Sequence, residues 1–184
     1  LPACYDVCGI IKNPETEFPV YNQGRLNTCS ANAVAAAIQF ERIKNGLQNY
    51  ITSRLFIHYC ARPPYRRYAK YGANISGCIR AISEYGVCDE RLWPYSDDGI
   101  QAGKRPPAKC YQIAKREMAN FSLLLSYPVQ KLDTLKSILV RNIPIIASIR
   151  LYESFKGRGA TTGIVTLPNI QTEKPLRKHA VLIV

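Results

Sequence analysis

Helix-forming and strand-forming patterns occupy different parts of this chain of 184 residues. In the larger, N-terminal part, apolar residues recur at helical spacing between recognisable start and stop signals. These segments predict helices over 29–44, 53–62, 76–85 and 107–119, after an irregular lead-in over 1–20. In the C-terminal part, apolar runs predict strands over 121–127, 143–151, 162–167 and 179–184, with a helix over 131–141. This segregation predicts an α+β protein.

Length and composition indicate a globular chain that can bury one core or the cores of two small lobes. Hydrophobic residues make up 47% of the chain and charged residues 21%. No run approaches the roughly 18 consecutive apolar residues that span a membrane. Residues 1–10 are not a secretory signal, because Asp6 and two cysteines interrupt them. We therefore expect no membrane partner.

The excess of basic residues raises the question of a polyanionic partner, because the formal net charge is +12. The densest basic stretch, 62–71, interleaves arginine with tyrosine, which can pair with phosphates and stack on bases. The alternative is a solvated loop that follows a helix ended by Pro63. We favour the loop, because the other basic residues are scattered and no nucleic-acid fold signature accompanies them. Nucleic acid is therefore not an expected partner.

The seven cysteines are open to three interpretations. One nucleophile and up to three disulfides would account for them, and so would a fully reduced chain. The third interpretation is metal binding, since Cys4 and Cys8 have a spacing found in zinc sites. No second close pair and no histidine cluster accompany them, so we expect neither a metal site nor another cofactor.

Cys29 stands out among the cysteines because it follows a tight loop and opens a predicted helix. Asn27 and Thr28 are favourable N-cap residues. The small apolar residues that follow at helical spacing are Ala31, Val34, Ala35 and Ile38. Unpaired backbone N–H groups and the positive end of the helix dipole stabilise a sulfur anion at such a place. The sequence therefore predicts that Cys29 is a nucleophile.

The stretch Gln23-Gly-x-x-x-Thr-Cys29 resembles the Gln-Gly-x-x-x-Ser-Cys signature of papain-like cysteine peptidases. Further landmarks that are similar, in order, are Ser53-Arg-Leu-Phe, Ser76-Gly-Cys78-Ile-Arg-Ala-Ile, Tyr85-Gly-Val-Cys88-Asp-Glu-Arg-Leu-Trp-Pro-Tyr95 and His179-Ala-Val-Leu-Ile-Val184. They cover most of the chain. The likeness is to the divergent microbial and viral branch, because Ser30 stands where lysosomal and plant enzymes carry an aromatic residue.

The resemblance implies a papain-like fold of two lobes within a single domain over 1–184. A helical lobe would cover about 21–120, and a β-rich lobe would cover about 121–184 together with the N-terminal segment 1–20. The two lobes would face each other across a substrate cleft. The catalytic cysteine would come from one wall and the histidine from the other.

Two histidines are candidates for the base that pairs with Cys29. His179 opens an apolar strand, and its separation from Cys29 matches the roughly 130 to 150 residues expected in papain-like enzymes. His58 lies inside an apolar helix, where a packed structural histidine is the ordinary explanation. We therefore assign His179 as charge partner of the thiolate and then general acid.

The resemblance assigns further roles around Cys29. The side-chain amide of Gln23 would join the backbone N–H of Cys29 as a donor to the oxyanion. Ser76 and Gly77 occupy the place where the family binds the extended substrate, although a helix N-cap and first turn explain them nearly as well.

A third catalytic residue is expected beyond the residues given. Papain-like enzymes carry an asparagine that follows the histidine and orients it, but this sequence stops in mid-strand soon after His179. We expect a further segment beyond Val184 to supply this asparagine and the remaining C-terminal strands. The alternative is a third member from elsewhere, and Asn169 precedes His179 in a loop.

The sequence thus predicts a cysteine peptidase that hydrolyses peptide bonds through an acyl-enzyme on Cys29. The alternatives are a transferase or amidase on the same scaffold and a catalytically impaired papain-like binding protein. The expected partner is a peptide or protein substrate. The family's inhibitory propeptides add a propeptide or protein inhibitor as a second class of partner.

Overall fold

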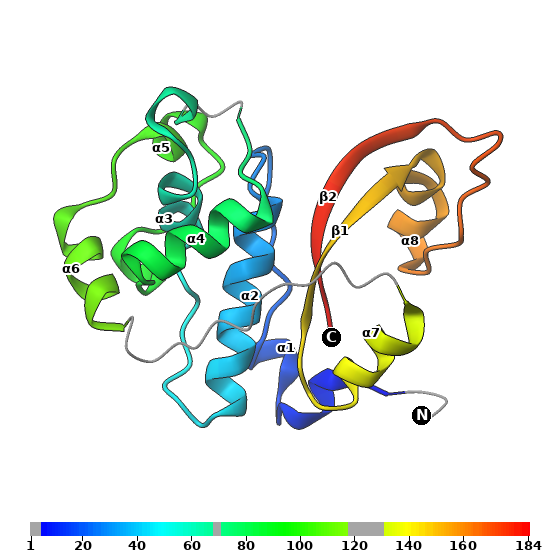
Figure 1. Ribbon diagram of the computed structural model, residues 1–184, viewed down its shortest axis with the longest axis horizontal. Helices are drawn as coiled ribbons and strands as arrows, with labels where there is room; N and C mark the ends of the chain where they lie inside the picture. Colours follow the sequence, from blue (N-terminus) through cyan, green and yellow to red (C-terminus); the bar gives the residue numbers. More distant parts are fainter. Residues whose placement is uncertain (1–4, 68–70, 118–130) are drawn as a thin grey trace.

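The computed structural model describes residues 5–67, 71–117 and 131–184. Figure 1 shows a group of helices on one side and a pair of long strands on the other. The helical group consists of α2 (Cys29–Lys44), α3 (Arg54–Cys60), α4 (Ile75–Tyr85), α5 (Gly99–Gly103) and α6 (Ala108–Glu117). The short 3-10 turns η2 (Pro64–Arg66) and η3 (Glu90–Leu92) connect them. All four helices predicted in this part are present.

Helix α2 lies between the other helices and the two strands. It contacts α3 and α4 on one side and both strands on the other. Its small side chains permit this close approach: Ala31, Val34 and Ala35 are buried and share a core with Ile57 of α3 and Ala81 of α4. The helix stops where Gly46 takes a left-handed conformation with φ of 66°, as a glycine after a helix end commonly does.

The second group contains α7 (Leu132–Leu139), β1 (Ile145–Tyr152) and β2 (Pro175–Ile183). The strands pair antiparallel, with Ile149 opposite His179 and Ala147 opposite Val181. Between them lie a π-helical turn, η5 (Phe155–Gly159), and the short helix α8 (Ala160–Thr162). The architecture is the predicted α+β arrangement of a helical lobe and a β-containing lobe.

The C-terminal part differs from the prediction in two places. Strand β2 begins at Pro175, so His179 lies in mid-strand and not at its start. The strand predicted over 162–167 is wrong, because α8 ends there and residues 164–169 form neither helix nor strand. Ile164 and Leu167 are 70% and 97% exposed, so no sheet face buries this apolar run among the described residues. The predicted strand over 121–127 lies outside the described residues, as does the predicted boundary between the lobes.

The N-terminal segment contains two short helical turns that the sequence did not predict, η1 (Val7–Ile10) and α1 (Pro14–Glu17). Val7 and Ile11 are buried against Phe40 of α2, and Leu139 of α7 and Val184 pack on the same cluster. The segment therefore joins the two groups. In the part of the chain that the structure describes, no helix is both long and apolar enough to cross a membrane.

Candidate active site

Cys29 is the first residue of α2, as predicted. Thr28 stands at the N-cap, but its side chain does not cap the helix. Its hydroxyl instead lies 2.6 Å from the hydroxyl of Tyr95 and accepts from Asn32 Nδ2 at 3.0 Å. The N–H groups of the first turn therefore receive nothing from the Thr28 side chain. The N-terminal end of a helix with uncapped N–H groups favours a nearby negative charge.

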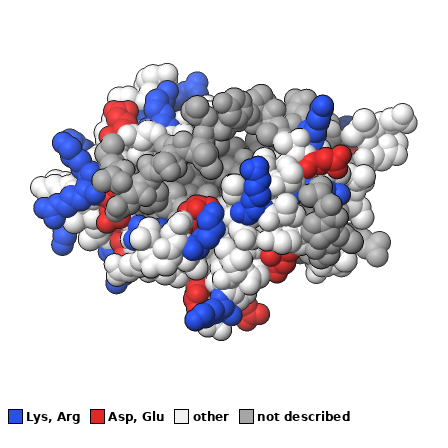
Figure 2. All heavy atoms as spheres, turned by 60° about the horizontal axis from the view of Figure 1, so that its bottom comes forward, with Lys and Arg blue, Asp and Glu red and all other residues white. Residues whose placement is uncertain are grey.

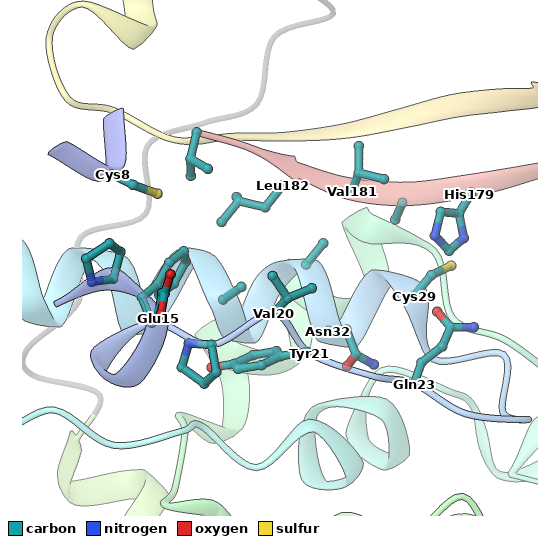
Figure 3. Close-up of a pocket in the computed structure, with 17 residues that line it drawn as sticks. Cys8, Glu15, Val20, Tyr21, Gln23, Cys29, Asn32, His179, Val181 and Leu182 are labelled. Carbon is teal, nitrogen blue, oxygen red and sulfur yellow. The ribbon is translucent and has the colours of Figure 1, made fainter. Parts of the chain in front are cut away.

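A cavity of about 630 Å³ lies between α2 and β2, and Cys29, His179 and Gln23 all line it. Figure 3 shows the imidazole of His179 and the sulfur of Cys29 pointing toward one another from facing elements, with Gln23 beside them. The structure thus brings His179 to Cys29 and Gln23, which lie far from it in the sequence. Away from these groups the cavity is mostly apolar, with Ala33 and Ala36 on one wall and Val181 on the other.

His179 is partly buried on β2, at the edge of the cavity. Burial, and to a smaller extent the positive charge of Arg177, lower the pKa of His179 below its usual value. Arg177 lies two residues earlier on the same strand, so both side chains leave the same face of the sheet. An anion in contact with the imidazole would oppose both effects, because it favours the charged form.

The loop that carries Gln23 has a shape that only glycine permits at its next residue. Gly24 has φ of 55°, and a Cβ at this position would lie 2.7 Å from Cβ of Asp97. The Gln23 side chain folds back over the loop and donates from Nε2 to the Leu26 carbonyl at 2.8 Å. An amide nitrogen has two protons, so one N–H of Gln23 remains for another acceptor.

Ser76 and Gly77 lie in the first turn of α4 and not on the cavity. The N-cap of this helix is Asn74, whose Oδ1 accepts from the Gly77 N–H at 2.6 Å. A Cβ on Gly77 would approach that oxygen to 2.8 Å and the Ala61 carbonyl to 3.1 Å. Close packing therefore explains Gly77, and the predicted cap role of Ser76 belongs to Asn74. A substrate-binding role for Ser76 and Gly77 stays a prediction.

The alternative histidine, His58, is fully buried in α3 and does not line the cavity. Burial, with a smaller contribution from the charge of Arg62, lowers its pKa to about 3. His58 is therefore a neutral residue of the helical core. Arg62 is also buried, and it donates to the carbonyls of His58 and Ala102 at 2.9 and 2.7 Å. The first arginine of the basic stretch 62–71 thus has a structural role.

On the face shown in Figure 2, several basic side chains gather at the left end, and elsewhere basic and acidic side chains are interspersed. Within residues 5–67, 71–117 and 131–184, no three His, Cys, Asp or Glu side chains gather closely enough to hold a metal ion. Cys4 lies outside this part of the chain. The described cysteines that are free thiols are Cys8, Cys29, Cys60, Cys78, Cys88 and Cys110.

Sequence reasoning missed Asn32, which lies on α2 one turn after Cys29 and also lines the cavity. Its amide donates to the Thr28 carbonyl at 2.9 Å, and its Oδ1 accepts from Arg54 at 3.0 Å. Both Asn32 and Arg54 are about 8% exposed. The sequence feature that could have pointed to Asn32 is an asparagine within a run of small apolar residues. A polar side chain buried in a helix needs hydrogen-bond partners from other parts of the chain.

Known proteins resemble this chain over most of its length, although no protein-family model matches it. It is 32% identical over 188 residues to an uncharacterized peptidase C1-like protein of Acanthamoeba polyphaga mimivirus, covering 98% of this chain and 59% of that protein. Its structure resembles xylellain, a cysteine protease from Xylella fastidiosa, with a TM-score of 0.76 and 35% identity. This match covers 89% of this chain and 64% of xylellain, so the chain spans less than two thirds of either relative. By sequence and by fold, the chain is similar to papain-like cysteine peptidases.

Proposed function

We propose that this chain carries the catalytic centre of a cysteine peptidase that hydrolyses peptide bonds through an acyl-enzyme on Cys29. The observation that supports the proposal best is the meeting of Cys29, His179 and Gln23 on one cavity. Each residue comes from a different element, and together they supply a nucleophile, a proton carrier and a neutral hydrogen-bond donor. The occupant of the cavity would be a peptide or protein substrate.

In the first half-reaction, the Cys29 thiolate adds to the peptide carbonyl while imidazolium at His179 holds the proton. The oxyanion accepts hydrogen bonds from the Cys29 backbone N–H and from the second N–H of Gln23. Collapse of the adduct breaks the carbon–nitrogen bond, and His179 gives its proton to the leaving amine. In the second half-reaction, His179 takes a proton from water, hydroxide adds to the thioester, and Cys29 leaves as the thiolate.

The electrostatics of His179 support a paired mechanism. Burial, and to a smaller extent Arg177, lower the pKa of His179, and a negative sulfur beside the ring would oppose this effect because it favours the charged form. A further hydrogen bond to the other ring nitrogen would strengthen this state. We also propose that residues about 21–120 and 121–184, with 1–20, act as two lobes of one catalytic domain.

Labelling of Cys29 tests the proposal directly. The full-length protein is treated with an epoxide inhibitor of papain-like enzymes, and the modified cysteine is identified by mass spectrometry. We expect stoichiometric labelling of Cys29, loss of labelling in Cys29→Ala, and turnover of peptide substrates by the unmodified protein. The matched control is Cys78→Ala, since Cys78 is a buried thiol of α4 that does not line the cavity.

The alternatives give different outcomes in the same experiment. Labelling of Cys29 without peptide turnover, but with transfer of the acyl group to an added amine, would favour a transferase. An impaired binding protein would show neither labelling nor turnover. That last result, obtained with a folded full-length chain, would overturn the proposed function.

A further inference from the structure

A group of buried polar residues lies next to the Gln23 loop, and one of them, Asn32, also lines the cavity. At its centre is Arg54, the first residue of α3, which is 8% exposed. Its Nε donates to Oε2 of Glu90 at 2.8 Å, and its Nη2 donates to Oε1 at 2.8 Å. This two-point pairing with Glu90, at the start of η3, fixes both the position and the plane of the guanidinium.

The third nitrogen of Arg54 points to the active-site loop and to the catalytic helix. Its Nη1 donates to the Asn22 carbonyl at 3.1 Å and to Oδ1 of Asn32 at 3.0 Å. The carbon at the centre of the guanidinium lies 3.8 Å from the centre of the Tyr95 ring. Arg54 therefore connects the residue before Gln23, the helix that begins with Cys29, and an aromatic ring.

Tyr95 supplies the next contact with the loop. Its hydroxyl donates to the carbonyl of Gln23 at 2.7 Å. A phenol has one proton, so in the 2.6 Å contact between Tyr95 and Thr28 the Thr28 hydroxyl is the donor. Asn32 then donates to the hydroxyl oxygen of Thr28 and to its carbonyl, at 3.0 and 2.9 Å. The donor and the acceptor are therefore assigned in every hydrogen bond that links Asn32, Thr28, Tyr95 and the Gln23 carbonyl.

These contacts hold the backbone on both sides of the expected oxyanion donors. The carbonyls of Asn22 and Gln23 are fixed before the loop turns, and the carbonyl of Thr28 is fixed directly before Cys29. The distance between the Gln23 side chain and the Cys29 N–H depends on these anchors. A displacement of about 1 Å in such a pair of donors can cost roughly a hundredfold in rate.

We propose that Arg54, Tyr95 and Asn32 are positioning residues that hold the Gln23 amide and the Cys29 N–H at the spacing the oxyanion requires. This inference rests on the proposed peptidase function. It assigns a catalytic consequence to a buried ion pair that contacts neither the cavity nor the expected substrate directly.

Tyr95→Phe is the sharpest test, because it removes one hydroxyl and keeps the ring beside Arg54. The chain offers a matched control in Tyr50→Phe. There the guanidinium carbon of Arg42 lies 3.9 Å from the Tyr50 ring centre, Arg42 pairs with Glu117 at 3.2 Å, and the Tyr50 hydroxyl contacts the same carboxylate at 3.4 Å. Arg42 is near the opposite end of α2, roughly 20 Å from Cys29 at about 1.5 Å per residue.

We expect Tyr95→Phe to lower kcat for a peptide substrate by about tenfold or more, with little change in KM. Binding of a peptide aldehyde, which forms an oxyanion on Cys29, should weaken by a similar factor. Alkylation of Cys29 by iodoacetamide forms no oxyanion, so its rate and pH profile should not change. Tyr50→Phe should leave all three measurements at their wild-type values.

A second pair of variants separates positioning from general stability. Arg54→Lys keeps the charge but loses the planar fork, and Arg42→Lys makes the same change at the control site. Both should lower the thermal midpoint, and only Arg54→Lys should lower kcat and aldehyde affinity. If both variants lose activity in proportion to their loss of stability, or if Tyr95→Phe keeps wild-type kcat and aldehyde affinity, the inference is overturned.

The two proposals fail in distinguishable ways. A wild-type protein whose Cys29 reacts with neither substrate nor epoxide would overturn the proposed function. A wild-type protein with Cys29-dependent turnover and an equally active Tyr95→Phe variant would overturn only the positioning role.

Discussion

Replacement of Gln23 by alanine is expected to impair catalysis far more than folding. In the folded chain the Gln23 side chain makes one loop hydrogen bond, from Nε2 to the Leu26 carbonyl at 2.8 Å. Loss of a hydrogen bond of this kind lowers the free energy of unfolding by about 0.5–1.5 kcal/mol. Loss of one oxyanion donor lowers kcat by about 10²–10³, which is about 2.7–4 kcal/mol of transition-state stabilisation. The loss of transition-state stabilisation should therefore exceed the loss of unfolding free energy by about 1 kcal/mol or more.

The assay measures kcat and KM for a peptide substrate together with the unfolding free energy in urea. Asn45→Ala is the matched control, because its amide also donates to a backbone carbonyl, that of Glu41 at 2.7 Å, but at the far end of α2. Asn45→Ala should lose comparable stability and no activity. An unchanged kcat in a folded Gln23→Ala protein, or an equal loss of kcat in both variants, would refute the assignment of Gln23 as an oxyanion donor.

Three further outcomes are expected. Arg177→Gln removes a positive charge that lowers the pKa of His179, so the alkaline limb of the kcat/KM profile should move to higher pH; a shift to lower pH would contradict this. His58 has a pKa of about 3 when folded, below its unfolded value, so its contribution to stability is complete above the unfolded pKa. That contribution should fall by about 1.4 kcal/mol per pH unit between roughly 6.5 and 3; urea unfolding at two pH values should show a weaker dependence in His58→Leu. Gly24→Ala forces an L-residue into φ of 55° against Asp97 and should cost about 1–3 kcal/mol of unfolding free energy, measured in the same way; a neutral result would show that the loop relaxes.

Local patterns predicted the helical lobe well because the signals lie within each element. The predicted helix over 29–44 matches α2, since small apolar residues repeat at helical spacing and Asn45 and Gly46 end the run. The predicted strand over 162–167 failed for the opposite reason. A strand needs a partner, and an apolar run alone could not show that Ile164 and Leu167 have no described sheet to pack against.

Some residues of the candidate site could likewise be predicted from local sequence, and others could not. Cys29 and Gln23 were recognisable because one loop and one helix start bring their chemistry together within a few residues. Asn32, Arg54 and Tyr95 were not, because each looks ordinary until its partners from other elements are known. Their roles depend on hydrogen bonds between α2, α3 and the segment after η3, and such pairings leave no local periodicity.

The sequence by itself determined that Cys29 begins a helix after a tight glycine loop, because helix starts and turns depend on neighbouring residues. It also pointed to His179 and to an α+β division. Only the tertiary structure decided that His179 meets Cys29 from mid-strand, that His58 is a neutral core residue, and that Asn74 rather than Ser76 caps α4. It also decided that Arg54 and Tyr95 anchor the Gln23 loop. These outcomes depend on burial and on contacts between distant segments, which arise only when the other helices and the two strands pack against α2.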